Sequence, residues 1–279
     1  MDISYFSALW ASGNQEMYNC AEYWDKRAGS FNEHKKKSSS GDMRTRIIEF
    51  ITARCQLSSY DSALDIGCGA GQYALALARM VGQVEGFDVS PKMIDFARGN
   101  AQKQDIQNTH FQVLSWADAS LEALQWEGAF SLVLASRTPA IGDKASLDKM
   151  IAASQKHCVL VTMAHTENSL REKLKKNVGW DERQARERHS FYCTCNLLWL
   201  MGYYPEVRYF PHEWTRRYSI DEAIETHSHF FERFDTLSAV QHEQLCHMIH
   251  QEAVDGMVHE TVRAKIACVY WDVTEKAVF

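Results

Sequence analysis

A glycine-rich stretch between two strand-like segments constrains the fold of this chain more than any other feature. Residues 63–73 read Ala-Leu-Asp-Ile-Gly-Cys-Gly-Ala-Gly-Gln-Tyr, and residues 84–90 read Val-Glu-Gly-Phe-Asp-Val-Ser. This order predicts a buried strand, a tight turn, a helix and a second strand that ends in a carboxylate. Glycines let the backbone approach a ligand that a side chain would block. Asp88 stands where α/β units place the acid that binds ribose hydroxyls, so we expect a nucleotide site.

The spacing of the glycines distinguishes two classes of nucleotide. A dinucleotide fingerprint, G-x-G-x-x-G, needs its third glycine three residues after the second. Gly67 and Gly69 fit this pattern, but the third position is Gln72, and the extra glycine comes early, at Gly71. The spacing therefore disfavours a nicotinamide-dependent oxidoreductase.

Strand-like and helix-like segments alternate from residue 62 to about residue 165, where the rhythm breaks. The predicted strands of this part are 62–66, 84–88, 109–114, 129–135 and 158–163. The last two are near-continuous apolar runs, as expected for parallel strands that are covered on both faces. Beyond residue 165 we predict a charged helix, an apolar helix over 191–201, a strand within 207–218, a helix over 236–254 and a terminal strand over 264–272.

The motif D-x-G-x-G-x-G over residues 65–71 resembles the first motif of the class I S-adenosylmethionine (SAM) dependent methyltransferases. Asp88 matches the ribose-binding acid of that family, and residues 90–94, Ser-Pro-Lys-Met-Ile, resemble the segment that follows it. The resemblance implies an α/β fold of three layers, with a Rossmann-like, mostly parallel sheet, a reversed terminal strand and a helical cap. It also implies SAM as the cofactor and S-adenosylhomocysteine as the product.

The resemblance also suggests which residues bind the cofactor. Asp65, Gly67 and Gly69 would face the methionine moiety, and Met93 or Phe87 would pack on the adenine. The turn over residues 115–118 matches the adenine-edge position, where Asp118 either accepts from the exocyclic amine or caps a helix from Ala119 onward. The predicted cofactor set is Asp65, Gly67, Cys68, Gly69, Gly71, Asp88, Val89, Met93, Trp116, Ala117, Asp118 and Ser136.

Four regions are expected along the chain. Residues 1–45 form an N-terminal helical lid, 46–165 the SAM-binding core, 166–256 a substrate-cap insertion that contains a strand, and 257–279 the terminal strand of the core. In many relatives an aromatic N-terminal segment folds over SAM. Here it would comprise Tyr18, Tyr23, Trp24 and Phe31, with 35–41 as a hinge. The alternative is a helix that is packed permanently on the sheet.

Residues 135–141 follow the fourth strand, where this family places its reactive centre. They lack the Asn/Asp-Pro-Pro-aromatic signature of enzymes that methylate exocyclic base amines and the Pro-Cys pair of cytosine-C5 enzymes. Together with the net charge of −6, this favours a small-molecule acceptor over nucleic acid. RNA or protein methylation and a non-catalytic SAM-binding or metal-sensing protein are the alternatives. The predicted substrate pocket is Tyr18, Trp24, Arg137, Thr138, Tyr203, Tyr204 and Trp214.

Methyl transfer needs a general base only when the acceptor must lose a proton. His165, just past the fifth strand, is the first candidate, ahead of the pairs 212–213 and 203–204. His242, Cys246 and His250 recur every four residues and would form one stripe on a helix. No H-E-x-x-H or paired C-x-x-C pattern accompanies them, so no metal site is predicted.

The remaining composition indicates a cytoplasmic protein. No apolar run reaches the length of a membrane span. The eight cysteines are scattered, and several lie in apolar segments, which suits reduced thiols better than a disulfide framework. The chain is expected to act as a monomer or a homodimer.

Overall fold

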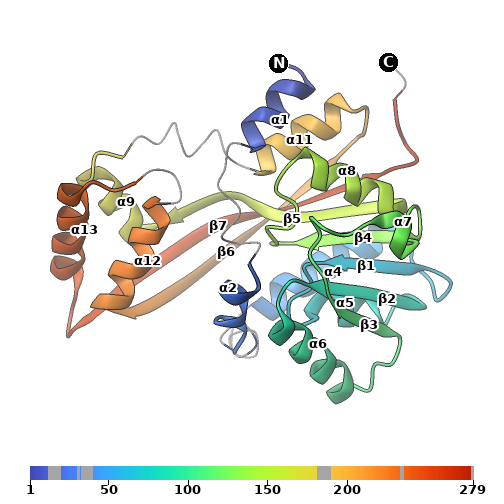
Figure 1. Cartoon of the computed structure of the whole chain (residues 1–279), viewed down its shortest axis with the longest axis horizontal. Coiled ribbons are helices and arrows are strands. Elements are labelled where there is room, and N and C mark those ends of the chain that lie inside the picture. Colours follow the sequence, from blue (N-terminus) through green and yellow to red (C-terminus); the bar gives the residue numbers. More distant parts are fainter. Residues whose placement is uncertain (12–19, 30–31, 33–39, 181–189, 233–235, 278–279) are drawn as a thin grey trace.

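One mixed sheet organises the chain (Figure 1). The computed structural model describes residues 1–11, 20–29, 32, 40–180, 190–232 and 236–277. Seven strands lie in the order β3-β2-β1-β4-β5-β7-β6. Strands β1 to β5 run parallel, and β7 runs antiparallel to both of its neighbours, which confirms the predicted α/β fold with a reversed terminal strand. The strands are β1 Ser62–Ile66, β2 Gln83–Asp88, β3 Thr109–Val113, β4 Phe130–Ser136, β5 Ser154–Asn168, β6 Glu206–Ser219 and β7 Met257–Asp272.

Helices cover both faces of the sheet and make the three layers. On one side, here named the α5 face, lie α4 (Ser40–Cys55), α5 (Gln72–Leu77) and α6 (Pro91–Lys103). On the other side, the α8 face, lie α1 (Ile3–Ala11), α7 (Leu121–Leu124), α8 (Lys144–Ala153) and α11 (Ser190–Leu200). Alternate side chains of each strand enter the two apolar cores, because successive residues of a strand point to opposite faces. In β1, for example, Ala63 belongs to the α5-face core and Leu64 to the α8-face core.

The last three strands are much longer than the others. β5, β6 and β7 have 15, 14 and 16 residues, whereas β1 to β4 have five to seven. Their pairing continues past the ends of β1 to β4, as far as Asn168 opposite Val262 and Ser219 opposite Met257. The continuation, residues 162–168, 209–219 and 257–267, is named the arm.

Three helices pack around the far end of the arm: α9 (Ser169–Asn177), α12 (Ile220–Glu232) and α13 (Ala239–Glu252). With the end of the arm they enclose a separate apolar cluster, and together they are named the distal module. The predicted insertion 166–256 thus contributes the helices of the distal module and most of the β6 part of the arm. It also contributes α11 and residues 206–208 of β6, which belong to the sheet and its two helical layers, here named the main body. No helix of the described residues is long and apolar enough to cross a membrane.

The N-terminal region contributes two helices to different places. Phe6 and Trp10 of α1 are buried in the α8-face core, and the Phe6 ring lies 5.6 Å from that of Tyr192 in α11. α2 (Ala21–Asp25) lies beside α6 instead. The predicted lid residues Tyr18 and Phe31 and most of the predicted hinge lie outside the described residues.

A buried polar cluster joins the arm to the distal module. Glu260 of β7 is only 2% exposed. Its carboxylate accepts hydrogen bonds from Asn168 Nδ2 at 2.7 Å and from the Tyr218 hydroxyl at 3.0 Å. His227 Nε2, on α12, lies 3.3 Å from Glu260 Oε2. Burial would raise the pKa of Glu260, but His227 and the two hydrogen bonds outweigh burial and lower that pKa to about 2.

Candidate active site

The glycine turn between β1 and α5 has a backbone that only glycine adopts readily. Gly67, Gly69 and Gly71 have φ angles of 64°, 54° and 78°, in the left-handed region. Space is also limited, because a Cβ on Gly67 would stand 2.2 Å from Thr138 Oγ1. Gly71 is the N-cap of α5, so the free N–H groups of the first helical turn lie beside the turn.

Two aspartates hold this turn in place. Asp88, at the end of β2, accepts hydrogen bonds from the backbone N–H groups of Gly69 and Ser90, each at 2.9 Å. Asp65 is buried and accepts from the N–H of Ala74 at 3.0 Å, which fastens the start of α5. Asp88 therefore lies at the turn, at the position expected of a ribose-binding acid, whereas Asp65 has a direct structural role as well.

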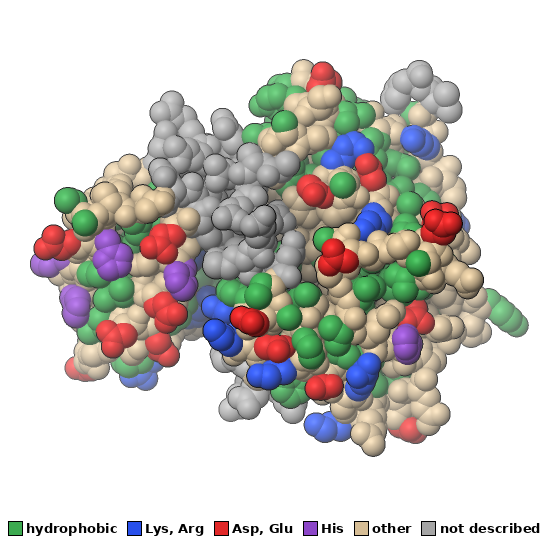
Figure 2. All heavy atoms as spheres, in the orientation of Figure 1, with side chains coloured by type: hydrophobic (Ala, Val, Ile, Leu, Met, Phe, Trp, Pro, Cys, Tyr) green, Lys and Arg blue, Asp and Glu red, His purple; other side chains and the backbone are tan. Residues whose placement is uncertain are grey.

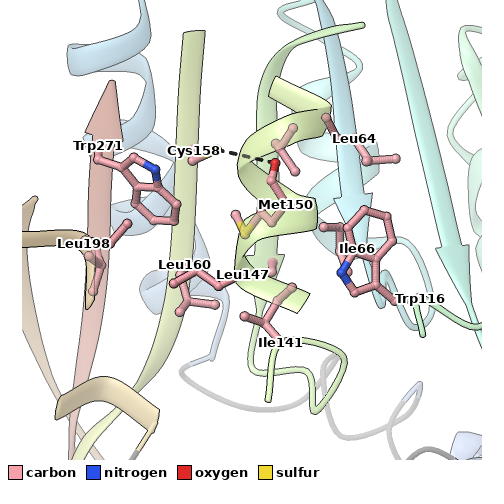
Figure 3. Close-up of a cluster of buried hydrophobic side chains, with 14 of the residues drawn as sticks. Leu64, Ile66, Trp116, Ile141, Leu147, Met150, Cys158, Leu160, Leu198 and Trp271 are labelled. Carbon is pink, nitrogen blue, oxygen red and sulfur yellow. Dashed lines mark hydrogen bonds between the residues drawn. The ribbon is translucent and has the colours of Figure 1, made fainter. Parts of the chain in front are cut away.

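The predicted adenine side is built on buried aromatic rings. Phe87 and Trp116 stack with centroids 5.4 Å apart and an interplanar angle of 19°. Figure 3 shows Trp116 near Ile66 within the apolar cluster, and its Nε1 donates to the carbonyl of Ser146 in α8 at 3.2 Å. Lys149 Nζ donates to the carbonyls of residues 116, 117 and 119 and so fixes the course of the turn.

Asp118 of this turn is exposed, and it is not the cap of the following helix. α7 begins at Leu121, and its N-cap is Ser120, whose hydroxyl accepts from the N–H of Ala123. The helix-cap alternative for Asp118 is therefore wrong, and its role at the adenine edge stays a prediction. On the ribose side, Cys68 and Met93 are buried and Val89 is half-buried. The Met93 sulfur lies 3.9 Å from where a Cβ of Gly69 would stand.

The end of β4 carries a strained residue. Arg137 directly follows β4, has a φ of 51° and donates its N–H to the carbonyl of Val161 at 2.8 Å. Residues of this backbone class are uncommon outside glycine and gather at functional sites. Burial raises the pKa of Tyr73, and Ser136 and then Arg137 oppose that rise. Thr138 lies against Gly67, so the β4 loop and the glycine turn are in contact.

The comparisons with known proteins agree with this geometry. A family model described as "Methyltransferase domain" matches residues 57–196. The chain belongs to this methyltransferase family. The match covers β1 to β5, α9 and part of α11, and ends before the arm closes on β6 and β7.

Individual relatives of the methyltransferase are distant. An uncharacterized protein of Haemophilus influenzae is 25% identical over 176 residues, which are 60% of this chain and 62% of that protein. A 23S rRNA (uracil(1939)-C(5))-methyltransferase of Psychromonas ingrahamii is 30% identical over 87 residues, 31% of this chain and 20% of that protein. Both matches span less than two thirds of the relative's length.

Solved structures share the fold of the methyltransferase. A putative methyltransferase from Bacillus halodurans superimposes with a TM-score of 0.50 at 13% identity, over 82% of this chain and 98% of that one. A magnesium protoporphyrin IX methyltransferase from Synechocystis, solved with bound S-adenosylhomocysteine, has a TM-score of 0.47 at 14% identity, over 82% and 81% of the two chains. Family membership makes this chain a SAM-dependent enzyme, and the substrate of a relative does not transfer at such identities.

Helix α2 of the methyltransferase lies next to the start of α6, directly after Asp88 and Val89. Asp25 accepts hydrogen bonds from the Ser90 hydroxyl at 2.5 Å and from the Lys92 N–H at 3.2 Å. Ser90 is itself the N-cap of α6, so Asp25 lies at the positive end of that helix. Sequence reasoning missed Asp25, because 65 residues separate it from Ser90 and no local pattern marks the contact.

The residues predicted for the substrate pocket are spread over several parts of the structure. Arg137 and Thr138 stand at the end of β4, and Trp214 lies in the arm. Tyr203 is buried at the opposite end of the strands. Burial is the main cause of the raised pKa of its hydroxyl, and Cys158 and Asp148 raise that pKa further. The other predicted residues are Tyr204, which is exposed beside α11, Trp24, which is in α2, and Tyr18, which is outside the described residues.

His165 lies on the α8 face of the arm. It pairs in register with Lys265, and both line a cavity of about 530 Å³ with Ala164, Phe191, Tyr209 and Pro211. His165 Nε2 lies 3.0 Å from Glu167 Oε1, and the hydrogen bond lowers the pKa of that glutamate. A histidine bound to an exposed carboxylate is available to solvent, and its catalytic role stays a prediction.

The histidine stripe is found on the outside of the distal module. Cys246 Sγ lies 3.6 Å from His242 Nδ1 on α13, and Figure 2 shows several histidines spread over this part of the surface. Across the described ranges, no three His, Cys, Asp or Glu side chains are placed to hold a metal ion.

Proposed function

We propose that this SAM-dependent methyltransferase transfers the methyl group to a small-molecule acceptor at the carboxyl ends of β1, β2 and β4. The observation that carries the proposal is the glycine turn, which Asp88 holds open and the β4 loop touches. A turn with three left-handed glycines, and with no room for a side chain at Gly67, fits a ligand bound against bare backbone. Open α/β sheets bind their ligands at this edge.

Two properties of the chain support a small acceptor. Its net charge is −6, which opposes the broad phosphate contacts of nucleic-acid enzymes. Residues 136–139, Ser-Arg-Thr-Pro, lack the signatures that base-methylating enzymes use at this loop. The similarity to the RNA methyltransferase covers only 31% of this chain.

The residues of the site divide the work of an in-line methyl transfer. SAM supplies the activated methyl group when bound. Asp88 would accept hydrogen bonds from the ribose hydroxyls, and the N–H groups at the start of α5 would hold the carboxylate of the methionine moiety. The β4 loop would align the acceptor, and alignment alone contributes several kcal/mol to such reactions. For an acceptor that must lose a proton, His165 is the predicted base.

Calorimetric titration with SAM, S-adenosylhomocysteine and NAD tests the proposal. The wild-type protein should bind both sulfur nucleotides and not NAD. Asp88→Ala should weaken that binding about tenfold or more, because a charged hydrogen bond is lost at each hydroxyl. Asp95→Ala is the matched control, since it removes an exposed acid from α6, where Asp95 makes only a long, 4.0 Å ion pair with Arg98.

The outcomes separate the parts of the assignment. Binding of NAD alone would overturn the cofactor class. Unchanged affinity in Asp88→Ala would refute the ribose role of Asp88. Once an acceptor is in hand, full turnover by His165→Ala would remove His165 as the base.

A further inference from the structure

One face of β6 alternates basic and aromatic side chains. Arg208, Phe210, His212, Trp214 and Arg216 stand at every second position, and they are named the β6 stripe. Residues at this spacing point to the same side of a strand. Phe210 is packed in the α5-face core, so the whole stripe lies on that face. His165 and its cavity lie on the opposite face of the arm, so an acceptor bound at the stripe would not use His165 as its base.

The stripe runs from the main body toward the distal module. At the start of the arm, Phe210 and the residue opposite it, Ile266, are both in the α5-face core. Farther along the arm, His212 and Trp214 are opposite Ala264 and Val262. Figure 1 shows the arm spanning from the main body to the distal module. Within the described residues, His212 and Trp214 therefore belong to neither of the two apolar cores of the sheet.

The end of β4 lies level with the start of the β6 stripe: Arg137 donates its N–H to the carbonyl of Val161, Val161 is opposite Cys268 in β7, and Cys268 is opposite Arg208 in β6. His212 is partly buried, and burial followed by the positive charge of Arg137 lowers the pKa of its imidazole. Arg137 also lies between Ser136, the last residue of β4, and Thr138, which lies against Gly67 of the glycine turn. Arg137 thus connects the stripe with the place where the proposed function delivers the methyl group.

Within the described residues, Arg137 differs from other arginines in its ion pairing. Other arginines nearby are paired: Arg263 with Glu213 and Arg54 with Glu206, each at 2.6 Å. No ion pair involves Arg137 in the part of the chain that the structure describes, and its side chain is exposed. An exposed guanidinium without a carboxylate partner is suited to a bound carboxylate or phosphate, which it can hold with two hydrogen bonds.

Trp214 supplies a flat surface at the centre of the stripe. Its ring is partly exposed and lies 5.1 Å from the His212 ring at an angle of 34°. The Arg216 guanidinium carbon stands 5.9 Å from the indole centroid. An indole between two nitrogen-rich groups stacks well on a planar, electron-rich ring.

We propose that the β6 stripe and Arg137 bind the methyl acceptor, and that this acceptor is a small planar molecule with a carboxylate or a phosphate. This inference rests on the proposed function, because it takes the end of β4 as the point of methyl delivery. Trp214 stacks on the ring of the acceptor, Arg137 holds its anionic group, and His212 accepts a hydrogen bond from its edge.

Titrations with matched naphthalene derivatives test this inference. The protein is first titrated with S-adenosylhomocysteine and then, in the saturated state, with naphthoate, naphthyl phosphate and the neutral naphthamide. At least one anion should bind about tenfold more tightly than the amide, as expected for a charge-assisted hydrogen bond. Preference for carboxylate over phosphate, or the reverse, identifies the anionic group.

Variants assign the binding to the stripe. Arg137→Gln should abolish the preference for the anion and leave the amide unaffected, whereas Trp214→Ala should weaken all three ligands. The controls are Arg263→Gln, on the opposite face of the arm, and Trp199→Ala, whose ring is 60% exposed on α11. Neither control should change any of the titrations.

The results distinguish this inference from the proposed function. If S-adenosylhomocysteine does not bind, the proposed function fails. If it binds but the three probes do not, or the amide binds as tightly as both anions, the inference alone is overturned. An oligouridylate that binds more tightly than either anion and depends on Trp214 would assign the stripe to nucleic acid and would also overturn it.

Discussion

The buried carboxylate of Glu260 should make the distal module sensitive to acid. In the folded chain, the pKa of Glu260 is lowered from its ordinary value of 4.5 to about 2. The folded state therefore binds this proton less readily than the unfolded state, and the charged form stabilises the fold. That stabilisation is complete above the unfolded pKa and is lost as the pH falls from about 5 toward 2.

The magnitude follows from the two pKa values. A fall from 4.5 to about 2 corresponds to about 3 kcal/mol of stability at neutral pH. About 2 kcal/mol of this should already be lost at pH 3, where the unfolded carboxyl is protonated and the folded one is not. Solvent does not screen this interaction appreciably, because Glu260 is only 2% exposed.

Glu260→Gln is the appropriate variant, since glutamine keeps the shape and one acceptor oxygen for Asn168 or Tyr218. We expect it to lower the free energy of unfolding at pH 7 by about 3 kcal/mol. Urea titrations of both proteins at several pH values measure the difference between them, which should shrink to about 1 kcal/mol at pH 3. Hydrogen exchange should report faster opening of α12 and α13.

Glu225→Gln is the control, because Glu225 is an exposed acid on the same helix, α12. A difference between wild type and Glu260→Gln that does not change with pH would refute the argument. It would mean that the carboxylate contributes to packing but does not carry a depressed pKa.

Three further predictions concern the site. Gly67→Ala should destabilise the protein by about 2 kcal/mol or more, because Gly67 has a positive φ and the new Cβ would meet the hydroxyl of Thr138. The control Gly99→Ala, with open space around the new Cβ, should be neutral or stabilising, and thermal unfolding compares the two variants. Asp25→Ala should raise the dissociation constant for SAM about fivefold by loosening α2, and Glu22→Ala, on the same helix, should not; equal effects would remove the specific role of Asp25. Arg137→Gly should raise the free energy of unfolding by about 1 kcal/mol through release of backbone strain, and an unchanged value in urea would show that no strain is stored there.

The parallel part of the sheet was predictable because strands that are buried on both faces consist of nearly continuous apolar residues. The predicted strands 129–135 and 158–163 are apolar runs; the first matches β4 to within one residue at each end, and the second lies within β5. The glycine turn was predictable because its backbone leaves little choice of residue. In both cases the cause lies within a few residues of the effect.

The arm could not be predicted in full, because its residues alternate between an exposed face and a partly covered one. β5 continues five residues past the predicted end through polar residues such as His165 and Glu167, and β7 starts seven residues before the predicted segment. Their partners lie about 40 to 105 residues away, so only tertiary pairing makes these segments strands. Helix α1 and the Asp25 contact were missed for the same reason, since both depend on distant neighbours.

The place of β7 in the chain has a consequence for how the protein is made. β7 follows the other six strands of the sheet in the sequence, yet it lies between β5 and β6, and its pairing with β5 joins residues as distant as His157 and Asp272. Until it arrives, the apolar edge of β5 has no partner, and the ribosome needs roughly 5–20 s to add the intervening residues. An unpaired strand edge of this kind invites aggregation. The yield of native protein during translation should therefore depend on how well the unpaired edge of β5 is kept from other chains before β7 is made.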